Sequence, residues 1–590
     1  MRIFDFDPQG LEEKLKSTKK RESVLSLGRL IVFIALLGFG VLSLSDSVIW
    51  LIPTLGFGIL FIYLIQKFNH IQDQQKIYQA LGLLADRKAQ RSQRKLKELD
   101  AGLEFTDKNH PFSGDLDLFG EHSLFQLVNH TFSPGGKSKL AQLMKEDLNP
   151  DASKNRSFAV KTLSEKSDFL RAMEASGLAF SEDIPLNDTW KKWLGAEEKR
   201  SKINQILSFL GPLGGLVLLG ATVWGNLPQG YLGLWVILGT ISLSRVFGPL
   251  KQAADALPVS SVLKSFGVRA HCIEQEVFRN SLLEEEKRKL FGGETSISQQ
   301  LNQLDRLALW VQNRMNLLYL PINLLLWTDF LLYDRLQSWK SKAGPSLSSL
   351  PEHLADWEVW VSLGAFELEM EGKGKIAWSD DSFLDAEEIS HPLILPTKAV
   401  ANSLRFDSDQ RLVILTGANM SGKTTFMRTL GINWVLAKMG LSPFAESLSL
   451  GDFQLYTSMR NTDNLGESVS SFYAELFRIK KLIDRLDSGE KVLFLLDEIL
   501  KGTNTQDRIS GSQALVDQIL QTHGFGIIST HDIELSELAK SKTGVKNYSF
   551  HSEIQDQEIK FDYLLKSGAC PSFNAHKLME LMGIRFKPST

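Results

Sequence analysis

Hydrophobic and polar positions divide the chain into a first part with long apolar runs and a last part with short ones. Two long runs, Leu30–Leu44 and Val48–Ile65, follow a charged N-terminus and are separated only by Ser45-Asp46-Ser47. Each run is close to the roughly 17–25 residues that cross a bilayer as a helix. The pattern therefore predicts a transmembrane hairpin near the N-terminus.

Lysine and arginine flank this hairpin on both sides, whereas its turn has neither. One basic cluster spans Lys14–Arg21 and another follows between Lys67 and Lys97. This positive-inside distribution predicts that both ends of the hairpin lie in the cytosol. We interpret the basic run Arg87–Lys97 as a solvated face near anionic lipid, with nucleic-acid contact as the alternative, so membrane lipid is an expected partner. A signal peptide is disfavoured because a second apolar run follows at once; a buried soluble hairpin remains the alternative.

The same signature occurs a second time. Ile206–Trp224 and Tyr231–Phe247 are apolar, their connecting turn is uncharged, and basic residues flank them. Four spans keep every sizeable soluble segment in the cytosol. A fifth run, Leu317–Leu332, is interrupted by a proline and by polar residues. We predict that it is a buried core helix, because an odd number of spans would place the rest of the chain outside the cell.

The remaining composition excludes some classes of function. The net charge of −3 and the pI near 6.5 give no global basic field for nucleic acid. Cys272 and Cys570 match no metal-site spacing, and so low a cysteine count suits a reducing compartment. The tryptophan-rich segments Trp327–Trp339 and Trp357–Trp360 are interpreted as helix packing, not as a surface that stacks on bases.

A glycine-rich loop gives the last third of the chain its chemistry. It follows the apolar run Leu412–Leu415 and precedes a helical pattern, as a G-x-x-x-x-G-K-[ST] phosphate loop requires. Lys423 would reach the β- and γ-phosphates of ATP, and the Thr424 hydroxyl would ligate Mg²⁺. The glycines let backbone N–H groups turn toward phosphates at a helix N-terminus. The expected nucleotide-binding residues are Gly417, Ala418, Asn419, Met420, Ser421, Gly422, Lys423, Thr424 and Thr425.

Two later apolar runs end in residues that suit ATP hydrolysis. Lys491–Leu496 reads as a central parallel strand and leads into Asp497 and Glu498. Asp497 is expected to hold Mg²⁺, and Glu498 to orient or deprotonate the attacking water. A second predicted strand, Gly524–Thr530, ends at His531, whose imidazole would sense or stabilise the γ-phosphate. Because ligands gather at the carboxyl ends of parallel strands, these groups should meet at one edge.

These segments resemble those of one family. Thr416–Arg428 resembles the phosphate loop of the MutS family of ABC-type ATPases, and Asp497–Asn504, Ser529–His531 and Ser572–Gly583 resemble further family segments. Leu116–Thr131 and Asn155–Val160 look like the start of the family's helical core. The resemblance covers roughly residues 115–195 and 255–590.

The resemblance implies roles for two further residues. Asn419 would contact the phosphates, and Ser470, in Ser470-Ser-Phe-Tyr473, would reach the γ-phosphate on a partner subunit. The ATP sites would then be composite and the working unit a homodimer. A helix N-cap is an equally good interpretation of Ser470.

The departures from the family pattern are also informative. The family's mismatch reader has an N-terminal domain with a Phe-x-Glu wedge, whereas the segment before residue 115 is hairpin and linker. The second hairpin falls near the place where the family inserts its DNA-gripping clamp. Ala399 stands where the family has an aromatic residue that stacks on adenine. The resemblance thus points to a membrane-tethered ATPase and not to a mismatch sensor.

The predicted fold class is multi-domain: an all-α core with transmembrane helical hairpins, followed by a C-terminal α/β P-loop ATPase domain of ABC type. The expected segments are 1–70 (N-terminal segment and hairpin 1), 71–195 (linker and first part of the core), 196–250 (hairpin 2), 251–390 (rest of the core) and 391–590 (ATPase domain).

The predicted function is ATP binding and hydrolysis at composite dimer sites, with Glu498, His531, Lys423 and Ser470 as catalytic residues. The predicted location is the cytoplasmic membrane, with multiple spans and the ATPase domain in the cytosol. Coupling to mismatched or branched DNA, as in mismatch repair, stays open, although the charge gives DNA binding no support. The alternatives are an ABC-type transporter and a nucleotide-gated membrane scaffold that does not bind DNA.

Overall fold

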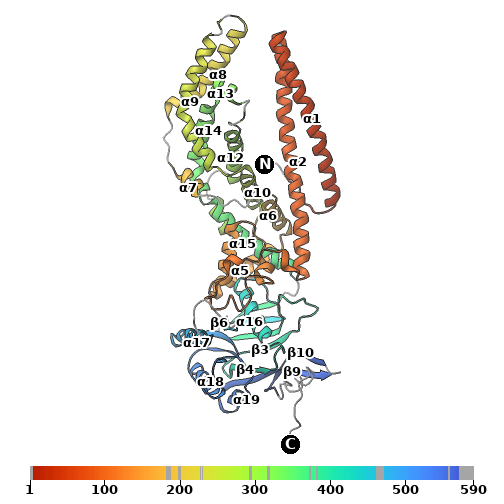
Figure 1. Ribbon diagram of the computed structural model, residues 1–590, viewed down its shortest axis with the longest axis vertical. Coiled ribbons are helices and arrows are strands. Elements are labelled where there is room, and N and C mark those ends of the chain that lie inside the picture. The colour runs from red at the N-terminus through yellow and green to blue at the C-terminus, as the bar shows by residue number, and fades with distance from the viewer. Residues whose placement is uncertain are drawn as a thin grey trace. The chain divides into compact units, whose positions relative to one another are not determined.

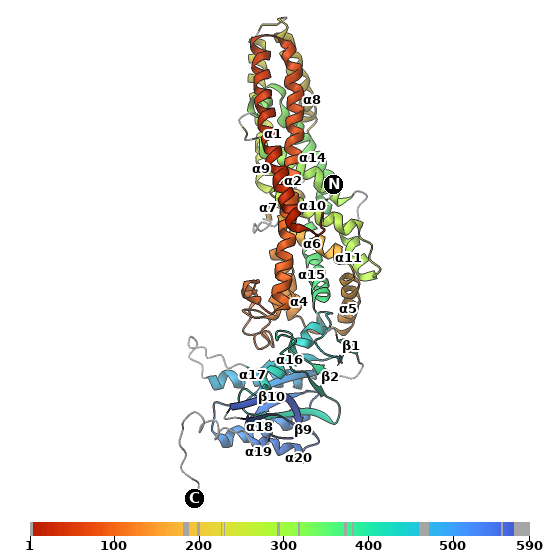
Figure 2. The same ribbon diagram turned by 90° about the vertical axis from the view of Figure 1, so that its right-hand side faces the viewer.

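The structure is a computed structural model, shown in two views in Figures 1 and 2. It describes residues 4–570 except 181–187, 197–200, 226, 229, 292–295, 315, 317–318, 371–373, 380–382, 460–470 and 556–557. The chain divides into two compact units. The helical unit comprises Met1–Asp86, Thr131–Lys137 and Lys166–Val361, and the sheet unit comprises Arg87–His130, Ser138–Glu165 and Ser362–Thr590. The five segments expected from the sequence stay a prediction.

The helical unit has no strand among its described residues. Its elements are α1 (Leu11–Ser45), η1 (Val48–Trp50), α2 (Leu51–Ser92), α6 (Ser167–Phe180), α7 (Asp188–Gly195), α8 (Lys202–Val223), α9 (Gly230–Ala256), α10 (Ser260–Gln275), α11 (Ser281–Phe291), α12 (Ile297–Asn313), α13 (Tyr319–Leu326), α14 (Thr328–Leu347) and α15 (Leu350–Glu369). Helices α2 and α15 also supply residues to the sheet unit, beyond Asp86 and Val361.

Four helices of this unit are long and apolar enough to cross a membrane, by length and composition. They are α1, α2, α8 and α9, which pair as two hairpins (Figure 1). Their apolar windows are between 0% and 17% buried, so side chains such as Ile59 and Phe209 lie exposed. Apolar faces of this size are rare on surfaces that contact only water. At 35 and 42 residues, α1 and α2 are about 50 and 60 Å long, well beyond the ~30 Å hydrocarbon core.

Within the run Leu317–Leu332, the described residues from Tyr319 onward do not form the single buried core helix predicted from the sequence, since Leu320 and Ile322 are exposed. The run is broken at Trp327, which has a φ of 49° and separates α13 from α14. Small residues of the second hairpin let the broken segment approach closely, since a Cβ on Gly211 would lie 2.5 Å from the Trp327 side chain. Trp235 stacks on Trp327 with ring centroids 4.3 Å apart and donates a 2.8 Å hydrogen bond to the Leu325 carbonyl. The segment therefore packs against the second hairpin, which the sequence did not predict.

The end of α2 that follows its apolar segment packs into the helical core. Ile77 and Leu81 are buried in a cluster with Phe180 of α6 and Val268 of α10. Lys264 of α10 lies 2.9 Å from Asp73 in an ion pair. The first part of α2 is thus apolar and exposed, whereas its last part is buried against α6 and α10.

The sheet unit combines helices with two sheets. Its helices are η2 (Leu96–Glu98), η3 (Leu103–Phe105), α3 (Leu124–Val128), α4 (Pro134–Lys145, shared with the helical unit), α5 (Pro150–Ser164), α16 (Lys423–Lys438), α17 (Ser471–Asp487), α18 (Thr505–Leu520), α19 (Ile533–Ser536) and α20 (Leu538–Ser541). Its strands are β1 (Lys375–Trp378), β2 (Leu384–Ile389), β3 (Asn402–Arg405), β4 (Gln410–Gly417), β5 (Ser447–Leu450), β6 (Gln454–Ser458), β7 (Val492–Asp497), β8 (Phe525–Thr530), β9 (Gly544–Gln555) and β10 (Glu558–Ser567).

The larger sheet has six strands in the order β10-β9-β4-β8-β7-β6. Strands β9, β4, β8, β7 and β6 run parallel to one another, and β10 pairs antiparallel with β9. The register pairs Thr416 with Thr530 and Asp497 with Ser529. The carboxyl ends of β4, β8 and β7 therefore meet at one edge, where α/β sheets bind ligands. The smaller sheet has the order β1-β5-β2-β3.

The buried core around the six-stranded sheet explains why its strands are continuous apolar runs in the sequence. Ile414, Phe494 and Ile528 are fully buried beneath residues of α17, α18 and α20, such as Leu482 and Val516. Strands covered on both faces need apolar side chains on both, as central parallel strands do. The predicted strands around Leu412–Leu415, Lys491–Leu496 and Gly524–Thr530 are present as β4, β7 and β8.

Candidate functional site

The glycine loop joins β4 to α16 through two glycines in unusual backbone conformations. Gly417, the last residue of β4, has a φ of 152°, and Gly422, which precedes α16, has a φ of 107°. A Cβ on Gly417 would lie 2.8 Å from the Phe550 carbonyl and from the Ser421 hydroxyl. A side chain at either position would strain the turn, so the loop requires glycine at both ends.

Lys423 lies inside this loop. Its side chain is buried, and its ammonium group donates hydrogen bonds of 2.8 Å to the Gly417 carbonyl and 3.0 Å to the Ala418 carbonyl. Burial lowers the pKa of Lys423, although the charges of Glu498 and Asp497 act in the opposite direction. The loop therefore holds a desolvated cation, which attracts a phosphate more strongly than a hydrated one.

The other loop residues differ in exposure. Asn419, Met420 and Thr425 are exposed, and Met420 has a positive φ of 65°. Ser421 is buried, and its hydroxyl has no hydrogen-bond partner in the described part of the chain. Since buried polar atoms are seldom left unpaired, the hydroxyl of Ser421 indicates a polar ligand in the loop.

Thr424 and Asp497 bring two oxygen ligands together. The Thr424 hydroxyl, in the first turn of α16, donates a 2.6 Å hydrogen bond to Asp497 Oδ2 at the end of β7. The Ser529 hydroxyl, on the neighbouring strand β8, donates to the other carboxylate oxygen. Hydroxyl and carboxylate oxygens are the ligands that Mg²⁺ prefers. The two predicted metal ligands thus fit that ion.

Glu498 and His531 are paired at the adjacent strand ends. His531 Nε2 lies 2.5 Å from Glu498 Oε1, and Lys501 forms an ion pair with the other carboxylate oxygen. Burial raises the pKa of Glu498, but the hydrogen bonds from His531 and Lys501 outweigh it and lower the pKa to about 2. Glu498 also has a φ of 51°, a strained conformation of the kind that clusters at functional sites.

A cavity of about 460 Å³ connects these groups. It is lined by the glycine loop and Glu498, and also by side chains of the segment between β2 and β3 and of the β9–β10 hairpin. This second group of lining residues includes His391, Ala399, Val400, Phe550 and Tyr563. Burial and the positive charge of Arg428 lower the pKa of His391 to about 4, so its imidazole is uncharged at neutral pH.

Tyr563 is a cavity residue that the sequence reasoning missed. It lies on β10, has a φ of 54°, and is 44% exposed. A Cβ on Gly422 would lie 3.1 Å from its ring, so the ring rests on the glycine loop. Asn402 fixes the backbone there, donating a 3.0 Å hydrogen bond to the Tyr563 carbonyl and accepting a 2.7 Å one from Leu565. In the sequence, the one feature that pointed to Tyr563 was an aromatic residue within a strand-like pattern near the C-terminus.

Two further residues also escaped the sequence reasoning. Lys501, which pairs with Glu498, follows it by three positions and could have been identified from that spacing. Glu475 lies in the first turns of α17, and its carboxylate accepts a hydrogen bond from the backbone N–H of Leu500. Burial raises the pKa of Glu475. This contact ties the start of α17 to the loop that follows Glu498.

The structure thus brings together Lys423, Thr424, Asp497, Glu498 and His531, together with the rest of the predicted loop. Two expectations lie outside the described residues: Ser470 and the family-like segment Ser572–Gly583. Among the described residues, no group of three or more His, Cys, Asp or Glu side chains could hold a metal ion by itself. A bound Mg²⁺ would therefore depend on Thr424, Asp497 and oxygens of a nucleotide.

Comparison with known proteins matches the part of the sequence that forms this site. Residues 413–584 match the sequence model of MutS domain V. The chain is 30% identical over 241 residues to the DNA mismatch repair protein MutS of Thermotoga sp. (strain RQ2), which covers 40% of the chain and 30% of the relative. It is 27% identical over 303 residues to the same-named protein of Aquifex pyrophilus, covering 50% and 34%.

A third relative extends the match. The DNA mismatch repair protein MutS of Flavobacterium psychrophilum is 27% identical over 352 residues, covering 57% of the chain and 36% of the relative. The chain thus spans about a third of the length of these relatives. The matched region 413–584 carries the glycine loop, the Asp497-Glu498 pair and His531. Through this region the chain is similar to domain V of the MutS family.

Proposed function

We propose that the protein is a membrane-anchored MutS-type ATPase with a P-loop fold, which binds and hydrolyses ATP. The observation that carries the proposal is the convergence of Lys423, Thr424 and Asp497 with Glu498 and His531 at one sheet edge. A buried ammonium in a glycine loop, a hydroxyl–carboxylate pair and a second carboxylate are the parts that phosphoryl transfer to water requires.

The phosphates would lie against the glycine loop, where Lys423 neutralises their charge and the backbone N–H groups at the start of α16 face them. Thr424 and Asp497 would hold Mg²⁺, which when bound neutralises developing charge on the phosphate oxygens. The hydroxyl of Ser421, buried without a partner among the described residues, supplies another donor. Preorganised groups of this kind need little reorganisation during the reaction.

Glu498 would position the attacking water. With its pKa held at about 2 by His531 and Lys501, its carboxylate is a strong hydrogen-bond orienter and a weak proton acceptor. Loss of the Lys501 pair would raise the pKa and make Glu498 a better base. In the wild type, His531 is hydrogen-bonded to the Glu498 carboxylate and would therefore lie close to the γ-phosphate.

The part of the cavity lined by Ala399 and Tyr563 would hold the base. Ala399 offers no ring there, but Tyr563 presents one against the same cavity. A stacked base gains about 1–3 kcal/mol from an aromatic partner. Tyr563 would thereby replace the aromatic residue that position 399 lacks.

The working unit would be a homodimer with composite ATP sites. This rests on the resemblance of Ser470-Ser-Phe-Tyr473 to the family's signature segment. The bond between Glu475 and Leu500 supplies a physical link, because it connects the helix that follows Ser470 to the loop that follows Glu498. Binding of Ser470 to a partner's nucleotide would therefore shift the position of Glu498. Closure of the dimer would in turn move the core helices.

Membrane anchoring is supported by the four apolar helices and by the basic flanks of both hairpins. The test is labelling of single cysteines at Ser47, in the first turn, and at Lys88, in the basic flank, with a membrane-impermeant thiol reagent on intact cells. We expect labelling at position 47 alone. Labelling at both positions, or at neither, would contradict the orientation.

DNA binding is the second candidate, because the matched relatives are named DNA mismatch repair proteins. If it holds, affinity for branched or mismatched duplex should fall steeply with salt, by about 0.9 log units per log unit of salt for each phosphate contact. Absence of binding at low salt would eliminate it. ATP turnover by the purified, full-length protein, lost in Glu498→Gln, tests the primary proposal.

A further inference from the structure

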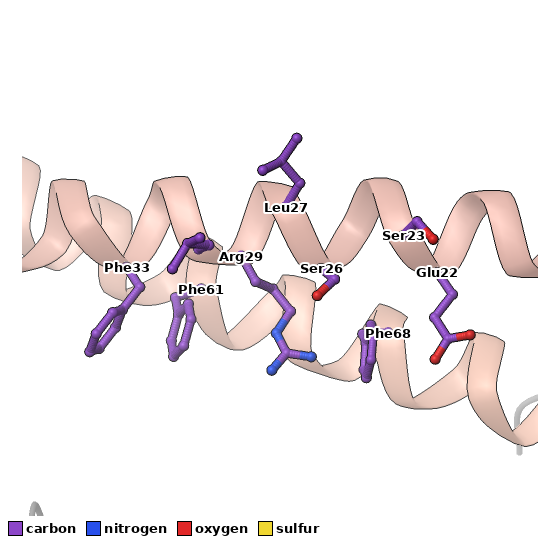
Figure 3. Close-up of a pocket in the computed structure, with 9 residues that line it drawn as sticks. Glu22, Ser23, Ser26, Leu27, Arg29, Phe33, Phe61 and Phe68 are labelled. Carbon is purple, nitrogen blue, oxygen red and sulfur yellow. The ribbon is translucent and has the colours of Figure 1, made fainter.

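A groove lies between the two helices of the first hairpin. Its volume is about 730 Å³, and it is lined by residues of α1 and α2 (Figure 3). The residues that matter for its chemistry are Glu22, Arg29, Phe33, Phe61 and Phe68. The groove occupies the part of the hairpin where the apolar run of α1 begins, beside the basic cluster that the sequence places in the cytosol.

Its chemistry changes along the hairpin axis. Figure 3 shows Phe33 and Phe61 at one end, Arg29 in the middle and Glu22 at the other end. The rings of Phe33 and Phe61 have centroids 5.5 Å apart and form an apolar floor. Seven residues separate Glu22 from Arg29, which is two helical turns or about 10 Å of rise. Apolar, cationic and anionic positions thus follow one another toward the aqueous side.

Arg29 contacts an aromatic ring and has an unpaired donor atom among the residues that the structure describes. Its guanidinium lies 4.3 Å from the centroid of the Phe68 ring. Its Nε atom is buried and has no hydrogen-bond acceptor among the residues that the structure describes. A guanidinium above a ring, with one donor unpaired, is a suitable partner for a phosphate oxygen.

Glu22 provides the opposite charge at the aqueous end. Its Oε1 accepts a 2.9 Å hydrogen bond from Gln72 Nε2 of α2, which fixes the carboxylate on the groove wall. A carboxylate accepts hydrogen bonds from a primary ammonium, but a quaternary ammonium has no N–H group to donate. The wall therefore distinguishes headgroups of equal net charge.

We propose that this groove binds a phospholipid with an ethanolamine headgroup. The acyl chains lie on Phe33 and Phe61, Arg29 pairs with the phosphate, and Glu22 accepts from the ammonium. One cation and one anion in this order match a zwitterion and not a purely anionic headgroup. The inference rests on the proposed membrane insertion and adds a lipid-specific site to it.

The experiment uses the full-length protein in detergent and native mass spectrometry to count retained lipids. The probes are dioleoyl phosphatidylethanolamine, phosphatidylcholine and phosphatidylglycerol at equal concentration. We expect the ethanolamine lipid to be retained about tenfold more than the choline lipid, as one charge-assisted hydrogen bond implies. Arg29→Gln should lower retention of all three lipids about tenfold.

Two matched controls separate the groove from general charge effects. Arg21→Gln removes an exposed arginine of the same helix outside the groove and should leave retention unchanged. Glu22→Gln should abolish the preference for ethanolamine over choline, whereas Glu13→Gln, at an exposed position, should keep it.

The outcomes distinguish this inference from the membrane proposal. Equal retention by Arg29→Gln and Arg21→Gln would overturn the site, and a preference for phosphatidylglycerol would overturn the headgroup assignment. If thiol labelling at position 47 shows normal insertion in either case, only the lipid site fails. If labelling shows no insertion, the membrane proposal fails first.

Discussion

The hydroxyl of Thr424 donates a 2.6 Å hydrogen bond to the carboxylate of Asp497, across 73 positions of sequence. The bond joins the first turn of α16, the helix that follows β4, to the end of β7. In the sheet, β8 lies between β4 and β7. Because both oxygens are hard ligands, their proximity is what a Mg²⁺–nucleotide complex requires.

Replacement of Thr424 by alanine should weaken Mg²⁺ binding without unfolding the site. We expect the Mg²⁺ concentration for half-maximal ATP hydrolysis to rise at least about tenfold, because one oxygen ligand is lost. Thr424→Ser keeps the hydroxyl and should stay close to the wild type. An unchanged Mg²⁺ dependence in the alanine variant would remove Thr424 from the metal site.

Glu498→Gln should abolish turnover and preserve ATP binding. The amide is nearly the same size, but it cannot accept the hydrogen bonds that orient water as the carboxylate does. We expect kcat to fall by at least about a hundredfold, with the ATP dissociation constant nearly unchanged. Fluorescent nucleotide binding and phosphate release measure the two quantities separately. Unchanged hydrolysis would exclude Glu498 as the catalytic carboxylate.

Lys501→Ala should shift the acid limb of the pH profile. In the wild type the pKa of Glu498 is about 2, below its ordinary 4.5, so its ionisation contributes stability above pH 4.5 that is lost as the pH falls from 4.5 to 2. Removing the Lys501 charge raises this pKa. The acid limb of kcat/KM should therefore move to higher pH.

The control for this experiment is Lys480→Ala. Lys480 is an exposed lysine of α17 that pairs with Asp484, away from Glu498. Its removal should leave the profile unchanged. Identical acid limbs in the wild type and in Lys501→Ala would show that Lys501 does not control Glu498.

Tyr563→Ala should weaken ATP binding more than Tyr563→Phe. Loss of a stacking ring costs about 1–3 kcal/mol, which corresponds to a roughly 5- to 150-fold higher dissociation constant. Phenylalanine keeps the ring and should bind nearly as tightly as the wild type. Adding Ala399→Phe to Tyr563→Ala should restore part of the affinity. Equal affinity in the wild type and the three variants would show that the base contacts neither residue 563 nor residue 399.

Gly215→Val should destabilise the contact between the second hairpin and α13. A Cβ at this position would collide with the Leu325 carbonyl. Overpacking of this kind costs about 1–3 kcal/mol, so the Tm in detergent should fall by several degrees. Gly233→Val is the matched control, because a Cβ there meets no atom within 4 Å. Equal Tm values would indicate that α13 does not pack on α8.

The sequence by itself identified the features whose chemistry is local. The loop from Gly417 to Thr425, the strand ends at Asp497 and His531, and the four apolar helices all follow from spacing and composition within one element or one turn. Such patterns are visible because a strand–loop–helix or a membrane span constrains consecutive residues.

Only the tertiary structure decided which distant residues meet. Tyr563 rests on the loop at Gly422 because β10 pairs with β9 beside β4, and Glu475 reaches Leu500 because α17 packs over β7. The break at Trp327 depends on close approach to glycines of the second hairpin. Sequence spacing determines the chemistry within an element, but strand order and helix packing bring the elements together, and these depend on the whole fold.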